Sequence, residues 1–222
     1  LSFTWISLPS PTGHERSISK TEVTVKQYKL CVQSGACAPL DQSFKPSFGL
    51  CTVHLEIEQL PINCLTYDEA LHFAAWVNKT YREAQRKGTH QAHHQDQISL
   101  PSKAEWIAAS HGQRYPWGEK SPNCQHAVFF ERAPSCNGAL KPQPVCSRVD
   151  GNNQNGACDL SGNLWEWVSP TKRLKPSDAL IMGGSWSSAA IDLELNIQRK
   201  RPKNSRDPSI GVRLIYRHYV EP

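Results

Sequence analysis

The sequence lacks any apolar run long enough to cross a bilayer, which takes about 20 consecutive apolar residues. Polar or charged residues interrupt every apolar stretch of the 222-residue chain well before that length. The opening residues, LSFTWISLPSP, also lack the charged segment and long apolar run of a signal peptide. We therefore expect no transmembrane segment and, if the protein is exported, a signal sequence that was removed before Leu1.

A strong excess of charge of one sign is also missing. Lysine and arginine number 25 and aspartate and glutamate 20, which gives a net charge of +5. Nucleic-acid-binding domains carry a denser positive charge, because they neutralise rows of phosphates. The composition argues against nucleic acid as a partner.

Common catalytic motifs are absent as well. The chain contains no HExxH motif, no GxSxG nucleophile elbow, no P-loop and no GxGxxG loop. This absence excludes the enzyme classes that these motifs identify. A Ser-His-Asp arrangement built from residues far apart in the chain remains open.

Cysteine, by contrast, is abundant, because the chain has eight cysteines in four successive local pairs and no CxxC cluster. Zinc sites favour tighter pairs, whereas nearest-neighbour disulfides would close four short loops. The expected disulfides are Cys31–Cys37, Cys51–Cys64, Cys124–Cys136 and Cys146–Cys158. Disulfides persist in oxidising compartments, so we expect a periplasmic or secreted protein. Eight buried free thiols in a cytosolic protein are the alternative.

Three capping boxes predict where helices begin. In each, a Ser or Thr is followed three residues later by Glu or Gln: Thr24 with Gln27, Thr66 with Glu69, and Ser102 with Glu105. The β-branched alternation of ISKTEVTV (18–25) predicts a strand that runs into the first helix. Beyond residue 112 we expect loops and short strands, because 16 prolines and 13 glycines interrupt the chain. The length fits one domain over residues 1–222.

Four blocks of sequence resemble one protein family. They are ISKTEVTVKQY (18–28), LPSKAEW (100–106) with YPWG (115–118), DLSGNLWEWV (159–168), and MGGSW (182–186) with GVRL (211–214). Together they resemble the strand-helix opening, the LPTEAEW…YPWG segment, the GNVWEW motif and the closing RGGSW…GFR of the formylglycine-generating-enzyme (sulfatase-modifying factor) family. The resemblance implies that family's fold, a single α+β domain related to C-type lectins, with little regular secondary structure.

The block around the Gly-Asn turn contains a candidate metal site. Two carboxylates lie seven residues apart, where they could converge with backbone carbonyls on one hard cation. The resemblance implies a calcium ion here, held by the side chains of Asp159 and Glu166 and the carbonyls of Gly162 and Leu164. We expect such an ion to stabilise the fold. The alternative is that these carboxylates cap the turn or pair with a nearby arginine.

The pair of cysteines that binds copper(I) in active aerobic members of the family is missing. At the matching offsets after GGSW, this chain has Ser188 and Leu193. A leucine has no lone pair to offer, and a serine hydroxyl is a poor ligand for a soft metal. We therefore expect no copper and no oxidase chemistry, and a non-catalytic member of the family is the leading hypothesis.

A retained framework without its metal ligands predicts a binding or regulatory protein. The expected partner is another exported protein or the periplasmic domain of a membrane receptor. The resemblance extends to TagR-like periplasmic regulators of type VI secretion, which act upstream of a membrane threonine kinase. A copper-independent enzyme of the same fold, as in siderophore maturation, and a lectin-like ligand-binding module are the alternatives.

One basic run could contact such a partner. The segment QRKRPKNSR (198–206) contains five basic side chains. It is either a solvated loop or a surface for an acidic partner. The candidate partner-binding residues are Arg199, Lys200, Lys203 and Arg206.

Overall fold

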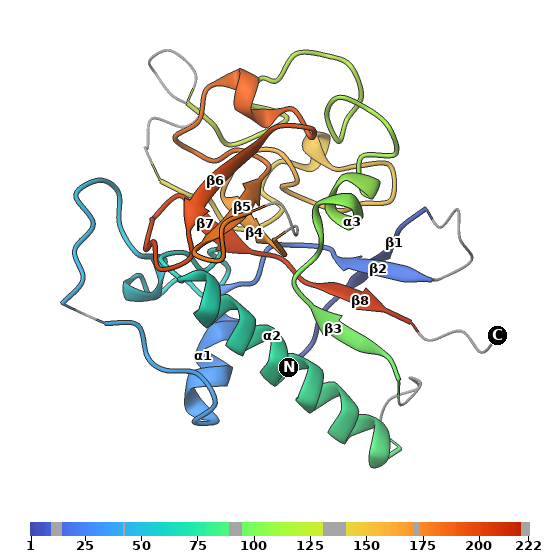
Figure 1. Ribbon diagram of the computed structural model, residues 1–222. Helices are drawn as coiled ribbons and strands as arrows, with labels where there is room; N and C mark the ends of the chain where they lie inside the picture. The colour runs from blue at the N-terminus through green and yellow to red at the C-terminus, as the bar shows by residue number, and fades with distance from the viewer. Residues whose placement is uncertain (10–14, 42, 89–94, 131–140, 171–173, 219–222) are drawn as a thin grey trace.

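Two four-stranded sheets organise the chain, whose computed structural model describes residues 1–9, 15–41, 43–88, 95–130, 141–170 and 174–218. The first sheet is antiparallel, in the order β1 (Trp5–Ser7), β2 (Arg16–Ser19), β8 (Ile215–Arg217) and β3 (Gln97–Ser99). The second has the order β6 (Gln198–Pro202), β5 (Asp178–Met182), β4 (Trp165–Val168) and β7 (Ile210–Val212), with β4 and β7 parallel. Figure 1 shows the first sheet to the right of the second.

Three α-helices begin at the three capping boxes, which confirms the predicted starts. They are α1 (Val25–Gln33), α2 (Tyr67–Arg86) and α3 (Lys103–Ala108). In each box the N-cap hydroxyl accepts a backbone N–H, and the Glu or Gln side chain accepts the N–H of the N-cap. Short 3-10 turns occur at η1 (Thr52–His54), η2 (Val149–Gly151) and η3 (Ala190–Leu193).

The predicted strand over residues 18–25 is shorter in the structure. β2 ends at Ser19, because the residues after it bond one at a time to different segments. The Val23 N–H donates to the carbonyl of Val212 at 2.8 Å, and Thr24 forms an isolated bridge with Pro61. The alternating pattern therefore predicts extended backbone correctly, but it does not specify the neighbours that would make a strand.

The core consists mainly of two buried clusters. One packs α1 and α2 against the second sheet and contains Phe73 and Trp167, and the other contains Trp106 and Leu160. A buried indole needs a partner for its N–H, and that of Trp167 donates to the carbonyl of Leu65 at 3.0 Å. The mixture of helices and two sheets confirms the α+β expectation. None of the helices among the described residues is long and apolar enough to span a membrane.

Candidate functional site

Ser188, the first of the pair of positions where the family resemblance implies a metal ligand, lies in a closed turn of hydroxyl groups. Its side chain is buried, and its Oγ accepts the N–H of Ser185 at 3.0 Å. The Ser188 N–H donates back to the carbonyl of Ser185 at 3.0 Å, and the Ser188 carbonyl accepts the N–H of Phe130 at 2.9 Å. The Ser188 side chain thus holds the turn together and provides no soft ligand for a metal.

The second half of that pair, Leu193, is a core residue. It is 0% exposed at the end of η3 and packs with Tyr115, Ala127 and Phe129. Its carbonyl accepts the hydroxyl of Ser161 at 2.7 Å. An aliphatic side chain packed in this way cannot hold a metal ion, so neither of the two positions offers a thiolate.

A buried ion pair holds the framework next to this turn. Glu166 in β4 and Arg213 after β7 are both completely buried. Arg213 donates from Nε to Glu166 Oε1 at 2.9 Å and from Nη2 to the same oxygen at 2.8 Å, and Trp106 Nε1 donates to Glu166 Oε2 at 2.6 Å. The remaining N–H groups of the guanidinium donate to backbone carbonyls, those of Ser19, Lys20 and Cys158. Every donor of this buried arginine therefore has an acceptor.

Two further carboxylates lie close to this pair. Asp159 has a φ of 54° and accepts the N–H of Cys146 at 2.6 Å, which ties its side chain to the backbone of the Cys146 segment. Glu22 is completely buried and accepts the N–H of Leu164 at 3.1 Å. Three carboxylates therefore surround one arginine, which leaves negative charge in the interior when all are ionised.

The electrostatics of these groups follow from that arrangement. Burial raises the pKa of the Asp159 carboxyl to about 6, although the Cys146 N–H and the Arg213 charge act in the opposite direction. Burial also raises the pKa of Glu22 well above its usual value, and the charges of Asp159 and Glu166 raise it further. The fold therefore favours the protonated forms of these two acids more than the unfolded chain does.

The ligand set predicted for calcium does not fit the ion in this arrangement. Both oxygens of Glu166 accept N–H donors, and a calcium ion would have to displace the guanidinium of Arg213 from them. The Oδ2 of Asp159 already accepts the N–H of Cys146. Among the described residues, no group of three or more His, Cys, Asp or Glu side chains could hold a metal ion. The geometry matches the alternative of a carboxylate that pairs with an arginine, and we propose that Arg213 stands in place of the predicted calcium ion.

Thermal unfolding tests this point. We expect the melting temperature to agree within about 1 °C in excess EDTA and in excess calcium chloride, because an ion stabilises a fold only when it binds the folded state. Magnesium chloride at equal ionic strength is the control for general salt effects. A calcium-specific rise of several degrees would instead support the ligand set that the sequence predicts.

Three of the expected disulfides are present and confirm the nearest-neighbour pairing. They are Cys31–Cys37, Cys51–Cys64 and Cys146–Cys158. The fourth predicted pair, Cys124–Cys136, includes Cys136, which lies outside the described residues. The Cys146–Cys158 bond closes the segment that leads into Asp159, so it helps to fix the buried charges.

The candidate partner-binding residues divide into two groups. Arg206 belongs to the framework, because it donates to both oxygens of Glu69 at 2.5 and 2.7 Å and to the carbonyl of Cys64 at 2.9 Å. Arg199 lies in β6 and pairs with Asp192 at 2.5 Å. The structure therefore engages two of the four residues in ion pairs within the chain.

The other two candidates, Lys200 and Lys203, form no ion pair with any described residue. Lys200 is exposed in β6, and the Nζ of Lys203 lies 5.4 Å from the centroid of the Tyr67 ring. Their charges are available at the surface.

Comparison with known proteins places this framework in a family. The model of the FGE-sulfatase family, described as "Sulfatase-modifying factor enzyme 1-like domain", matches residues 13–218. The chain is 26% identical over 184 residues to the hercynine oxygenase of Mycolicibacterium thermoresistibile, a match that covers 70% of this chain and 36% of that protein. It is 26% identical over 141 residues to the inactive C-alpha-formylglycine-generating enzyme 2 of Bos taurus, covering 60% and 40% of the two chains. It thus spans well under half of these relatives.

A solved structure gives the same result for the fold. The crystal structure of CarF superimposes with a TM-score of 0.73 at 17% identity, covering 99% of each chain. The family model matches nearly the whole chain. The chain therefore belongs to the sulfatase-modifying factor, or formylglycine-generating-enzyme, family.

Proposed function

We propose that this chain is a non-enzymatic binding or regulatory domain built on the formylglycine-generating-enzyme scaffold. The observation that carries the proposal is the fate of the metal-binding positions. Ser188 closes a turn through its hydroxyl, and Leu193 packs in the core. The framework around them remains intact, including the Glu166–Arg213 pair. A relative named as an inactive formylglycine-generating enzyme is compatible with a scaffold that persists without this activity.

The partner that we propose is another exported protein or the periplasmic domain of a membrane receptor. The disulfides support export, since such bonds persist in oxidising compartments. A narrower version, a TagR-like regulator of type VI secretion that contacts a threonine kinase, rests on the sequence resemblance alone. A binding assay with the purified periplasmic domain of such a kinase tests it, and no binding at micromolar concentration would remove this narrower version.

An enzyme that works without the copper pair is the second candidate. It is favoured by the similarity to hercynine oxygenases, although the match covers only 36% of the first of them. Metal analysis and oxygen uptake with hercynine separate the two candidates. We expect no stoichiometric iron or copper in the purified chain and no oxygen uptake. Bound iron with hercynine-dependent uptake would favour the enzyme. A lectin-like module would instead bind defined sugars on a glycan array.

A further inference from the structure

We propose that the hairpin of β5 and β6 carries a basic ridge that docks on a carboxylate-rich surface of a protein partner. The ridge consists of Lys175, Lys200, Arg201 and Lys203. The inference rests on the proposed function, because it names the surface and the partner chemistry of a chain that acts by binding.

The charges of the ridge are not neutralised within the described part of the chain. Arginines elsewhere have carboxylate partners, as in Arg114–Glu194, Arg206–Glu69, Arg213–Glu166 and Arg217–Glu105. The four ridge cations form no ion pair with any described residue. Lys175 and Lys200 are exposed, and Arg201 and Lys203 are partly exposed. Unpaired cations grouped in one place favour an acidic partner.

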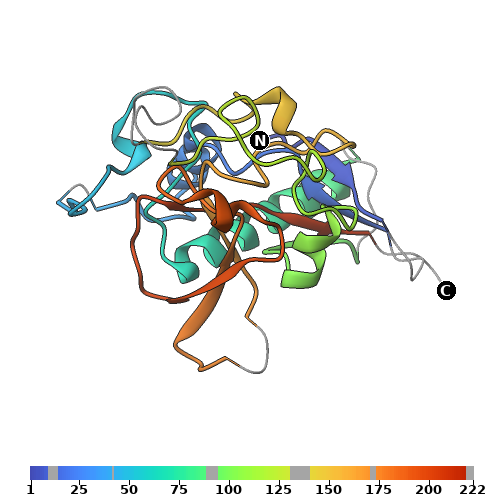
Figure 2. The same ribbon diagram turned by 90° about the horizontal axis from the view of Figure 1, so that it is seen from above.

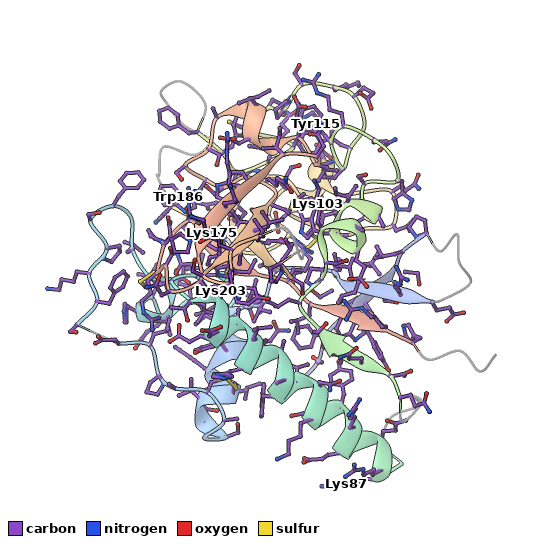
Figure 3. The ribbon with its side chains drawn as sticks, in the orientation of Figure 1. Lys87, Lys103, Tyr115, Lys175, Trp186 and Lys203 are labelled. Atoms are coloured by element: carbon purple, nitrogen blue, oxygen red, sulfur yellow. A yellow bond between two sulfur atoms is a disulfide. The ribbon has the colours of Figure 1, made fainter. Side chains whose placement is uncertain are left out.

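The four residues lie along one exposed edge of the second sheet. Arg201 and Lys200 are neighbours in β6, the edge strand, so their side chains leave opposite faces of the sheet at that edge. The Lys203 N–H donates to the carbonyl of Ser177 at 2.8 Å, which places Lys203 beside a residue only two positions after Lys175. Figure 3 labels both lysines. In Figure 2 the orange segment that leads into β5 extends away from the rest of the chain, so a partner can reach it.

The backbone edge of β6 is a poor template for another strand, so the ridge acts through its side chains. The backbone N–H of Lys203 points toward β5, because it bonds to Ser177. The direction of the backbone groups alternates along an antiparallel strand, so those of residues 198, 200 and 202 point away from β5, at the open edge of the sheet. Pro202 has no N–H to donate, and the carbonyl of Lys200 already accepts Arg201 Nη1 at 3.0 Å. These features oppose strand addition.

Protection of the sheet edge does not account for the whole ridge. Charged residues on an edge strand prevent edge-to-edge aggregation, and Arg199 and Lys200 in β6 satisfy that need. Lys175 and Lys203, however, lie outside β5 and β6, so they protect no open edge of the sheet. The ridge segments, 174–182 and 198–206, contain no aromatic residue. They therefore offer neither the stacking that single-stranded nucleic acid uses nor the apolar anchors of membrane-binding surfaces.

A charge-reversal series tests the ridge. The probe is a fluorescent poly-glutamate peptide of about 20 residues, and binding is followed by fluorescence anisotropy at low and physiological salt. The test variant is Lys175→Glu/Lys200→Glu/Lys203→Glu. The matched control, Lys87→Glu/Lys120→Glu/Lys141→Glu, changes the net charge equally at exposed lysines elsewhere. We expect the Kd to rise at least tenfold in the test variant and less than threefold in the control. Thermal melts establish that both variants are folded.

Each other outcome overturns the ridge. Equal losses in both variants would mean that net charge alone attracts the peptide. Binding of the wild-type chain to heparin or anionic vesicles but not to the peptide would assign the surface to another class of partner. The proposed function is tested separately, because oxidation of a cysteine peptide by the same preparation would refute it whether or not the ridge binds.

Discussion

Replacing Arg213 by methionine is expected to destabilise the fold by about 4 kcal/mol, because the substitution leaves a buried carboxylate without its counter-charge. Glu166 would retain only the Trp106 N–H, and Glu22 and Asp159 would lose the nearest positive charge. The backbone carbonyls of Ser19 and Cys158 would also lose a donor. Urea unfolding at pH 7 measures the change.

Arg206→Met provides the matched control. Arg206 also binds a carboxylate, but its side chain is 26% exposed, so water can replace its contacts with Glu69. We expect a cost of about 1 kcal/mol for that variant. Combining Arg213→Met with Glu166→Gln should recover part of the stability, since it removes the unpaired charge. Equal losses for the two arginine variants would show that the buried pair has no special role.

The second large effect is a change in the pH dependence of stability in Asp159→Asn. The folded-state pKa of Asp159 is about 6, and that of an unfolded aspartate is about 3.9. The folded chain thus holds this proton more tightly, and the wild type loses stability as the pH rises from 4 through 6. Asparagine can still accept the Cys146 N–H but does not titrate. The stability of the variant relative to the wild type should therefore rise by about 2 kcal/mol between pH 4 and pH 7.

Urea unfolding across this pH range, in EDTA, checks the expectation. Asp150→Asn, at an exposed position of η2, is the control for removing one carboxylate. A stability difference between Asp159→Asn and wild type that does not change with pH would mean that Asp159 titrates in the fold as it does in the unfolded chain. Burial of the Asp159 carboxyl would then have no effect on its pKa.

Local features of the fold were predictable from the sequence. The capping boxes at Thr24, Thr66 and Ser102 predict helix starts because each depends on side chains only three residues apart. Nearest-neighbour cysteine pairing succeeds for a similar reason, since short loops bring the two thiols together. The strand over 18–25 was predicted too long because pairing depends on distant segments.

The buried charge cluster could not be predicted in the same way. Glu22 and Leu164 are 142 residues apart, and nothing in the block ISKTEVTV marks Glu22 as a buried acceptor. Two carboxylates near a Gly-Asn turn suit a calcium ion and an arginine equally well. Only the folded chain brings Arg213 onto Glu166.

The framework and the former metal positions form one hydrogen-bonded unit. The Gly162 N–H donates to the carbonyl of Gly183 at 2.8 Å, and the Trp186 N–H donates to the carbonyl of Asn163 at 2.9 Å. Backbone hydrogen bonds therefore join the segment beside the buried charges to the turn that contains Ser188. These bonds do not depend on a metal ion, which is compatible with the proposed role as a scaffold.

The most direct test of the account is an assay for that chemistry. The purified, disulfide-intact chain is incubated with copper(I), oxygen and a cysteine-containing peptide, and mass spectrometry follows the peptide. The account predicts that no aldehyde forms, because neither the Ser188 hydroxyl nor the packed Leu193 side chain can bind copper(I). Conversion of the cysteine to an aldehyde by this chain would contradict it.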